Sequence, residues 1–339
     1  MALLFVGGVI RLRRHLGAAL TPRPGLASPA EIGHDTARES GGAMGTLIAK
    51  KYPTKLFLKA ADHTYVECGT GGKAWSCWGG KVGGAAFNRA TGSTLRADAI
   101  AEPNERAAIT CYLVNGVCHQ AANRILFPAG IVVSGARGYT LSVSIFGIYG
   151  RAGTGACSTP IPFNDHPGVK GDLAACTAPP ARGSSSPAKS SAPPHREAAH
   201  LKSIQGMYKG FSAATMTALD AMNLHVRMFE QEVSFRFSGK LPSMKAQGLR
   251  QAKTQVELTH HQMTERFGRG ELEAAMFVIE FNAMTDMFQT SAANALTGPQ
   301  FKQMFGHERD EHLVLADPDA IDASFGQGTA RRVYPAQLP

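Results

Sequence analysis

The chain of 339 residues lacks several patterns that identify common protein classes. Its six cysteines include no CxxC pair, so the usual signature of a structural zinc site is missing. Six cysteines in this length are also too few for a scaffold held together by disulfides. The net charge is +9, yet no run of Lys and Arg with interleaved aromatic residues occurs, which argues against nucleic-acid binding. We therefore expect no metal, no cofactor and no nucleic-acid partner.

Phosphate-binding loops and membrane spans are missing as well. Two segments, GTGGKAW and CWGGKVGGAA, contain Gly-Gly-Lys, but they lack the spacing and the trailing Ser or Thr of a phosphate-binding loop and are better explained as turns. The N-terminal apolar run is too short to span a membrane, so no transmembrane segment is expected. Its positive charges follow the apolar run, whereas a secretory signal carries them before it.

Residues 1–43 are therefore interpreted as a disordered or targeting-like extension. The first acidic residue is Glu31 and several arginines precede it, which resembles an organelle transit peptide. A start site assigned upstream of Met44 would look the same. The compartment is not fixed by the sequence, and a cytoplasmic location is the default expectation.

The composition then divides the rest of the chain into four regions. Residues 44–155 are rich in glycine and carry short apolar runs bounded by Gly, Asn and Pro, which predicts an α+β domain. Residues 156–199 form a Pro/Ser/Ala-rich linker that cannot bury enough apolar surface to order itself. Residues 200–300 show helical periodicity, and residues 301–339 are expected to form a flexible tail.

Within residues 44–155 six runs are of strand length. They are KLFLKA, HTYVEC, KAWSCWGG, ITCYLV, GIVVSGA and YTLSVSIFGIYG. The second and third are separated by a glycine-rich turn, which predicts a tight β-hairpin. One helix is expected to start near Cys118.

The helical region is predicted to contain one long helix and two shorter ones. Apolar residues step by three or four positions from Leu201 to Phe237, and SGKLPS then breaks the helix. A second helix follows, GRG interrupts it, and a third ends at TGP. These helices are expected to form an antiparallel bundle or long helical hairpin, or to self-associate through residues 200–300.

Cys118 stands at an unusual junction. The apolar run from Ile109 to Val114 meets Asn115-Gly116, and the predicted helix begins at the cysteine. A thiol in the first turn of a helix lies at the positive end of the helix dipole, which favours the thiolate. The unpaired N–H groups of that turn can also hold a developing oxyanion. Nucleophilic catalysis further requires a base within reach of the sulfur, most often a histidine.

The segment CYLVNGVCHQAANRIL resembles the cysteine segment of the circularly permuted NlpC-type papain-like superfamily, which includes lecithin:retinol acyltransferase. In that group a histidine at the start of a strand precedes the cysteine in the chain, and DHTYVEC supplies this element with His63. The resemblance covers roughly residues 55–127. It differs from the commoner Asn-Cys junction because Gly116 and Val117 lie between Asn115 and Cys118.

The resemblance implies that Cys118 is the nucleophile and His63 the general base. A third polar group would orient the imidazole. Glu67 lies on the same strand and, by alternation, on the same face as His63, and residues of KAWSCW are equally placed to reach it. The substrate-binding candidates are the two tryptophans of the chain, Trp75 and Trp78, together with Asn115 and Gln120.

Each of these residues also has a structural interpretation. A free cysteine is often buried and only packs, and His63 alone would be read as a surface or capping residue. His119 points away from Cys118 on a helix and is read as structural or cleft-lining. The adjacent His260 and His261 project in different directions, so we expect them on a solvated helix face.

Two functions remain open from the sequence. The first is a thiol-dependent hydrolase, such as a cysteine peptidase or amidase, or an acyltransferase, acting on a peptide or lipid acyl substrate through an acyl-enzyme on Cys118. The second is a non-enzymatic assembly or surface-binding protein that works through its long amphipathic helices, which faintly resemble those of phasins. In that case the papain-like domain would be degenerate.

Overall fold

The structure, a computed structural model, describes residues 44–54, 56, 60–69, 72–75, 80–105, 112–151, 195–209 and 217–338. The chain divides into two units, residues 1–40 and 41–339, and every described residue belongs to the second. This second unit contains an antiparallel sheet and a helical C-terminal region, which confirms the expected mixture of helices and strands. The predicted N-terminal extension and most of the predicted linker lie outside the described residues.

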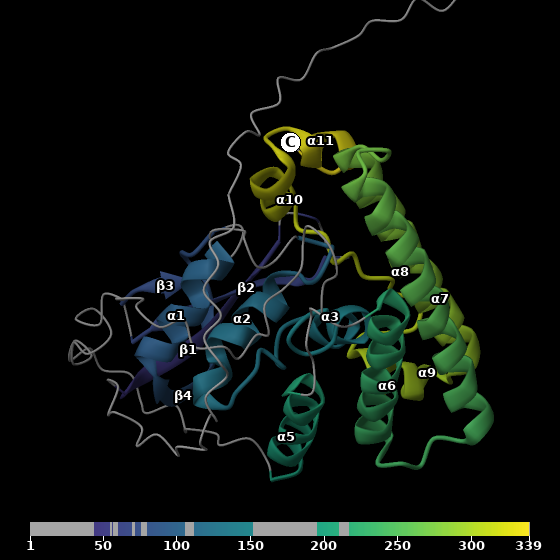
Figure 1. Cartoon of the computed structure of the whole chain (residues 1–339), viewed down its shortest axis with the longest axis horizontal. Coiled ribbons are helices and arrows are strands. Elements are labelled where there is room, and N and C mark those ends of the chain that lie inside the picture. The colour runs from purple at the N-terminus through teal and green to yellow at the C-terminus, as the bar shows by residue number, and fades with distance from the viewer. Residues whose placement is uncertain are drawn as a thin grey trace, which may run out of the picture. The chain divides into compact units, whose positions relative to one another are not determined.

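The four-stranded sheet has the order β3-β2-β1-β4 (Figure 1). Its strands are β1 (Met44–Pro53), β2 (Asp62–Cys68), β3 (Ala74–Trp75) and β4 (Ala85–Ser93), and all neighbouring pairs are antiparallel. The predicted hairpin is confirmed, because β2 pairs with β3 in the expected place. Strand β2 is central and buried along nearly its whole length.

Several sequence predictions for this region are wrong. The run YTLSVSIF forms helix α3 (Tyr139–Phe146), and residues 131–137 form bends and turns. Residues 112–116 form a turn, and the start of ITCYLV lies outside the described residues. Strands β1 and β4 were not expected. Neither strand shows a regular alternation of apolar and polar residues, and Leu47, Ile48 and Ala49 of β1 are buried in succession, on both faces of the strand.

Helices α1 (Thr94–Glu105) and α2 (Cys118–Leu126) accompany the sheet. Helix α2 contacts β2 and β1, and α1 contacts α2 and β1. Ala122, Ile125 and Leu126 of α2 share a core cluster with residues of β1 and β2. The predicted helix near Cys118 is therefore confirmed, and it begins at that residue.

The C-terminal part is built from successive helices. They are α5 (His195–Lys209), α6 (Ala218–Phe237), α7 (Ser243–Gly268), α8 (Ala274–Ala295), α9 (Gly298–Phe305), α10 (Pro318–Phe325) and α11 (Thr329–Val333). The expected breaks at SGKLPS, GRG and TGP fall where the structure ends one helix and starts the next. Helices α7 and α8 pack side by side (Figure 1). The long first helix was predicted wrongly, because Thr217 has an extended backbone and caps the start of α6.

The predicted flexible tail is also wrong. After α9 the chain continues through a buried segment, residues 313–317, into α10 and α11. Asp317 caps α10 by accepting a hydrogen bond from the N–H of Asp319 (3.0 Å), and Pro318 occupies the first helical position. Local capping and burial thus order a segment whose polar, Asp-rich composition resembles a tail.

The core does not separate the two regions that the sequence analysis treated as different domains. One apolar cluster combines Leu113 and Phe146 with Phe281 of α8 and Leu315 near the C-terminus. The second cluster joins β1 and β2 to Leu201 of α5. Residues before and after the linker therefore share both core clusters.

A buried ionic network crosses the same boundary. Glu257 of α7 accepts hydrogen bonds from both terminal nitrogens of Arg151, one of them at 3.1 Å. Lys253 Nζ lies 2.6 Å from the same carboxylate, and His225 Nδ1 of α6 lies 3.2 Å from it. All four side chains are buried. One carboxylate thus offsets the permanent charge of Arg151 and the charge of Lys253, whose pKa is lowered to about 8 by burial. Burial also lowers the pKa of His225 to about 4, so that its ring stays neutral.

We expect Glu257→Gln to destabilise the protein strongly. The substitution removes the carboxylate that pairs with the buried Arg151 and Lys253, and breaking a comparable buried pair costs about 3–5 kcal/mol. Urea unfolding of both proteins measures the difference. Glu265→Gln, which removes a partner of the exposed Arg269, should leave the midpoint unchanged. A Glu257→Gln midpoint equal to that of the wild type would contradict a stabilising role for the network.

Candidate active site

The turn before Cys118 has a specific local structure. Leu113 has a φ of 60°, a left-handed conformation that an aliphatic residue rarely adopts, and its N–H donates to the carbonyl of Gly116 (2.9 Å). A Cβ atom at Gly116 would lie 2.9 Å from the Cβ of Gln120, so a larger residue there would collide with the first turn of the helix. The Asn-Gly junction seen in the sequence therefore has a steric reason.

Gln120 fixes the start of α2. Its side-chain oxygen accepts a hydrogen bond from the N–H of Val117 (3.1 Å), while the N–H groups of Gln120 and Ala121 donate to the carbonyl of Val117. This arrangement places Cys118 at the first helical position. The N–H groups of Cys118 and His119 precede any intrahelical acceptor, as in the first turn of every α-helix.

Cys118 and His63 lie together in the structure. The two side chains are hydrogen-bonded, although they come from different elements, the start of α2 and the start of β2. The sulfur also lies 3.7 Å from the backbone oxygen of Asp62. Among the described cysteines Cys118 is the free thiol, and Cys68 is disulfide-bonded. The nucleophile and base proposed from the sequence are therefore brought into contact.

Asp317 provides the third group. Its Oδ2 lies 2.9 Å from Nδ1 of His63, and its Oδ1 accepts the N–H of Asp319. With Nδ1 bonded to the carboxylate, Nε2 of His63 is the nitrogen left for the sulfur of Cys118. The arrangement is a nucleophile, an imidazole and an orienting carboxylate in series, which is the order of groups in a catalytic triad.

The segment that carries Asp317 is held on two sides. The N–H of Ala61, next to β2, donates to the carbonyl of Val314 (2.9 Å). Gln289 of α8 both donates to the carbonyl of Leu313 (3.0 Å) and accepts its N–H (2.8 Å). These bonds bring a carboxylate to a histidine 254 positions earlier in the chain.

Tyr112 connects the cysteine turn to the aspartate. Its buried hydroxyl accepts the N–H of Asp317 (2.7 Å) and lies 3.5 Å from the carbonyl of Leu315. The tyrosine directly precedes the left-handed Leu113 of the turn. One side chain therefore fixes the distance between the element that presents the thiol and the element that presents the carboxylate.

The charge state of His63 follows from its neighbours. Burial is the largest influence and lowers its pKa, but the negative charge of Cys118 and the hydrogen bonds with Asp317 and Cys118 together raise the pKa to about 10. His63 is therefore protonated near neutral pH and donates from both ring nitrogens. Tyr52, which stands opposite His63 in the sheet, contacts the imidazole with ring centres 4.8 Å apart and ring planes tilted by 32°.

His119 has a structural role beside the site. Its Nε2 lies 3.0 Å from the backbone oxygen of Asp62 and its Nδ1 lies 2.9 Å from the hydroxyl of Ser142. Burial lowers the pKa of His119 to about 4, so the ring is neutral and Nε2 carries the proton donated to Asp62. The same backbone oxygen faces the sulfur of Cys118, and the bond from His119 occupies part of its acceptor capacity.

Glu67 does not occupy the orienting position suggested for it. It shares a face of β2 with His63, as alternation predicts, but four residues of strand separate the two by about 13 Å. Its carboxylate forms an ion pair with Lys50 at 2.6 Å. Asp317 takes the place next to His63. The sequence contains a signal for it only as a helix cap, the Asp-Pro pair that starts α10.

The predicted substrate-binding residues have mixed outcomes. Trp75 is buried in the core and donates from its indole nitrogen to Asp98 (3.1 Å), so it packs and does not line a cleft. Trp78 lies outside the described residues. The amide of Gln120 is occupied by Val117, Ser142 and Gly147. Asn115 is buried in the turn, and its backbone oxygen accepts the N–H of Arg151 (2.8 Å).

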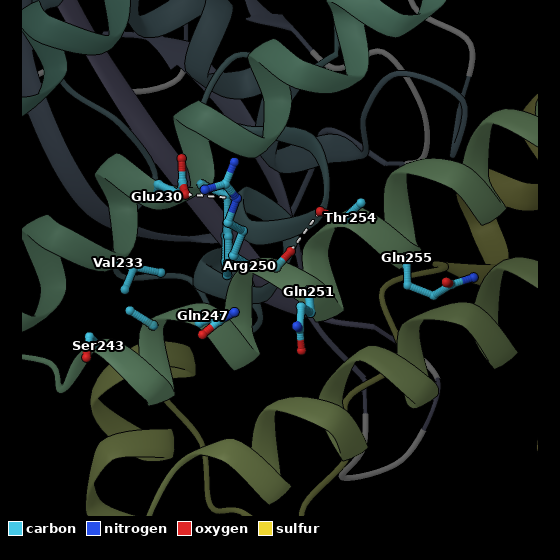
Figure 2. A pocket seen from close by; sticks show the side chains of 10 residues that line it. Glu230, Val233, Ser243, Gln247, Arg250, Gln251, Thr254 and Gln255 are labelled. Atoms are coloured by element: carbon cyan, nitrogen blue, oxygen red, sulfur yellow. Dashed lines mark hydrogen bonds and ion pairs between the residues drawn. The ribbon is translucent and has the colours of Figure 1, made fainter.

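A large groove lies away from this site, between α6 and α7 (Figure 2). It encloses about 740 Å³ and contains an ion pair between Arg250 and Glu230 at 3.3 Å. Its walls are formed by Phe229, Glu230, Val233, Ser243, Ala246, Gln247, Arg250, Gln251, Thr254 and Gln255. None of these side chains is a cysteine or a histidine, so the groove offers no pair of nucleophile and base.

The described part of the chain also lacks two other features. No group of three or more His, Cys, Asp and Glu side chains in it is arranged to hold a metal ion. Across the same residues, no helix combines the length and the apolar character that crossing a membrane requires.

Comparison with known proteins adds no relative. No protein-family model matches the chain, and no match is found among curated proteins or solved structures. The chemistry of the site is therefore argued from its own residues.

We expect the neutral, buried His119 to make the protein sensitive to acid. Unfolding exposes the ring and restores its usual pKa near 6.5, so the unfolded chain binds the additional proton as the pH falls from 6.5 to about 4. Stability should decline across that window by up to about 3 kcal/mol from this residue alone.

Urea unfolding between pH 7 and pH 4 measures this decline. His119→Gln keeps an N–H for the carbonyl of Asp62 but cannot be protonated, so its stability should depend less steeply on pH. His261→Gln on the partly exposed face of α7 serves as the control and should retain the wild-type slope. Identical slopes for wild type and His119→Gln would show that the ring is not held neutral.

Proposed function

We propose that this protein is a thiol-dependent hydrolase or acyltransferase that forms an acyl-enzyme on Cys118. The observation that supports the proposal is the series of hydrogen-bonded side chains from Cys118 through His63 to Asp317. These groups come from three separate parts of the chain. Order along the chain, His before Cys, and the position of the thiol at a helix start support a permuted papain-like fold for this part of the unit.

In the first step the thiolate of Cys118 attacks the carbonyl carbon of an amide or ester. The new C–S bond forms as the carbonyl π-electrons move to oxygen, and the N–H groups of the first turn of α2 are placed to stabilise that oxyanion. The oxyanion collapses and the bond to the leaving amine or alcohol breaks. Protonated His63 donates its Nε2 proton to the leaving group.

In the second step the acyl group leaves the enzyme. Neutral His63 accepts a proton from water or from an acceptor alcohol or amine, which then attacks the thioester. The C–S bond breaks and the sulfur departs as the thiolate, next to an imidazolium once more. Asp317 keeps Nδ1 of His63 protonated throughout, so that Nε2 remains the nitrogen that exchanges protons. Water as acceptor gives hydrolysis, and an alcohol or amine gives acyl transfer.

The site is closed to solvent in this structure. The side chain of Cys118 is 4% exposed and that of His63 is 0% exposed. A water-excluding site strengthens the attraction between thiolate and imidazolium. Catalysis at so buried a thiol requires that the substrate gain access to the sulfur.

The alternative, an assembly or surface-binding protein, has weaker support. Helices α6, α7 and α8 direct most of their large apolar side chains into the shared core. The exposed large apolar residues of these three helices are Leu219, Met244, Leu258, Met276, Ile279 and Met287. Most of the large apolar side chains are thus used for internal packing, which favours the enzymatic proposal.

We expect iodoacetamide to alkylate Cys118 well below the pH at which an ordinary thiol reacts. A free cysteine with a pKa near 8.5 is about 0.3% thiolate at pH 6, whereas an ion-paired thiolate persists there. Allowing for the lower nucleophilicity of a stabilised thiolate, the rate at pH 6 should exceed that of His63→Ala by about 10- to 100-fold. Mass spectrometry of peptides identifies the modified cysteine.

The alkylation rate of Asp317→Asn at pH 6 should lie between those of the wild type and His63→Ala, because the amide still bonds the ring but no longer stabilises its charge. Glu67→Gln is the matched control on the same strand and should react like the wild type. A second assay incubates the protein with p-nitrophenyl acetate and looks for one added acetyl group on Cys118 by intact mass. If Cys118 is inert in both assays, or His63→Ala reacts as fast as the wild type, the proposal fails.

A further inference from the structure

A buried donor from the helical region holds the backbone of the cysteine turn. His260 of α7 has its Nε2 2.8 Å from the carbonyl of Leu113. This histidine is buried, so the expectation that it lies on a solvated face is wrong. A carbonyl oxygen can only accept, and Nε2 must therefore carry a proton and donate it to Leu113.

Leu113, whose carbonyl accepts this bond, has a backbone conformation that needs support. A left-handed aliphatic residue costs roughly 1–3 kcal/mol and persists only where its surroundings hold it. Leu113 is held by its own N–H to Gly116 and by the donor from His260. Five residues later the chain enters α2 at Cys118, so a change at Leu113 moves the thiol relative to His63.

Other members of the buried network hold neighbouring carbonyls. The N–H of Arg151 donates to the carbonyl of Asn115 (2.8 Å), and Lys253 Nζ donates to the carbonyl of Ile145 (2.9 Å). Arg151 and Lys253 are the two cations that Glu257 offsets. The ring of His260 is further fixed by edge-to-face contacts with Phe146 and Phe281 at 5.9 Å and 6.3 Å.

We propose that His260 is a positioning residue for the Cys118 thiol, acting from α7 through the carbonyl of Leu113. This inference rests on the proposed function, since it concerns how the nucleophile is placed. It implies that the helices after the linker are part of the catalytic unit, because the donor that supports the turn belongs to them. Burial lowers the pKa of His260 well below its usual value, in keeping with a neutral ring beside Arg151 and Lys253.

Two substitutions at the same position separate the hydrogen bond from packing. His260→Gln keeps an N–H at about the position of Nε2, whereas His260→Leu keeps apolar bulk but has no donor for Leu113. The measurement is the rate of Cys118 alkylation by iodoacetamide as a function of pH, on the full chain.

His260→Leu should move the midpoint of the profile towards that of an ordinary thiol and lower the rate at pH 6 by about 10-fold, because the thiolate is no longer held against His63. His260→Gln should stay within about twofold of the wild type, since it restores the donor.

Val256→Ala controls for general loosening of α7. Val256 is buried on the same helix and belongs to the core cluster. This variant should unfold at lower urea concentration yet keep the wild-type pH profile. A wild-type profile in His260→Leu, or a shifted one in Val256→Ala, overturns the positioning role while the proposed function stands. If Cys118 of the wild-type protein is inert at pH 6, both the positioning role and the proposed function are overturned.

A second measurement covers the case in which His260→Leu does not fold. Nitrogen-15 NMR of histidine-labelled wild type reports which ring nitrogen of His260 carries the proton. The expected state is neutral, with a proton on Nε2 that exchanges slowly with water. A proton on Nδ1, or rapid exchange at Nε2, contradicts a bond to the carbonyl of Leu113.

Discussion

The contact between Asp317 and His63 is the interaction on which the candidate site depends. It requires that the C-terminal segment run beside β2, that Gln289 of α8 hold the segment there, and that Tyr112 set its distance from the cysteine turn. Each of these contacts links regions far apart in sequence. The site is therefore a property of the whole folded unit and cannot be assigned to residues 44–155 alone.

This dependence explains what the sequence could and could not predict. The junction at Cys118 could be predicted because Gly116, Gln120 and the helix start act over a few residues, and the base on β2 was implied by the resemblance to the permuted papain-like superfamily. Asp317 was missed because an Asp-Pro helix cap says nothing about which distant residue the carboxylate will meet. His260 was misplaced for a similar reason, since adjacent histidines show their different directions but not which of them enters the core.

The same difference between local signals and long-range contacts explains which strand and helix predictions were correct. Breaks at SGKLPS, GRG and TGP were correct because glycine and proline act locally. YTLSVSIF was assigned to a strand because a short, continuous apolar run gives no period that distinguishes a buried helix from a buried strand. As α3 it is buried at every position, which removes the polar face that would have revealed it.

The long separation between His63 and Asp317 also has a consequence for biosynthesis. A ribosome adds about 5–20 residues per second, so roughly 10–50 s pass between the synthesis of the base and that of the carboxylate that orients it. During this interval the emerging chain already carries Cys118 and His63 but lacks Asp317. The three groups of the candidate site can therefore come together only when nearly all of the protein has been made.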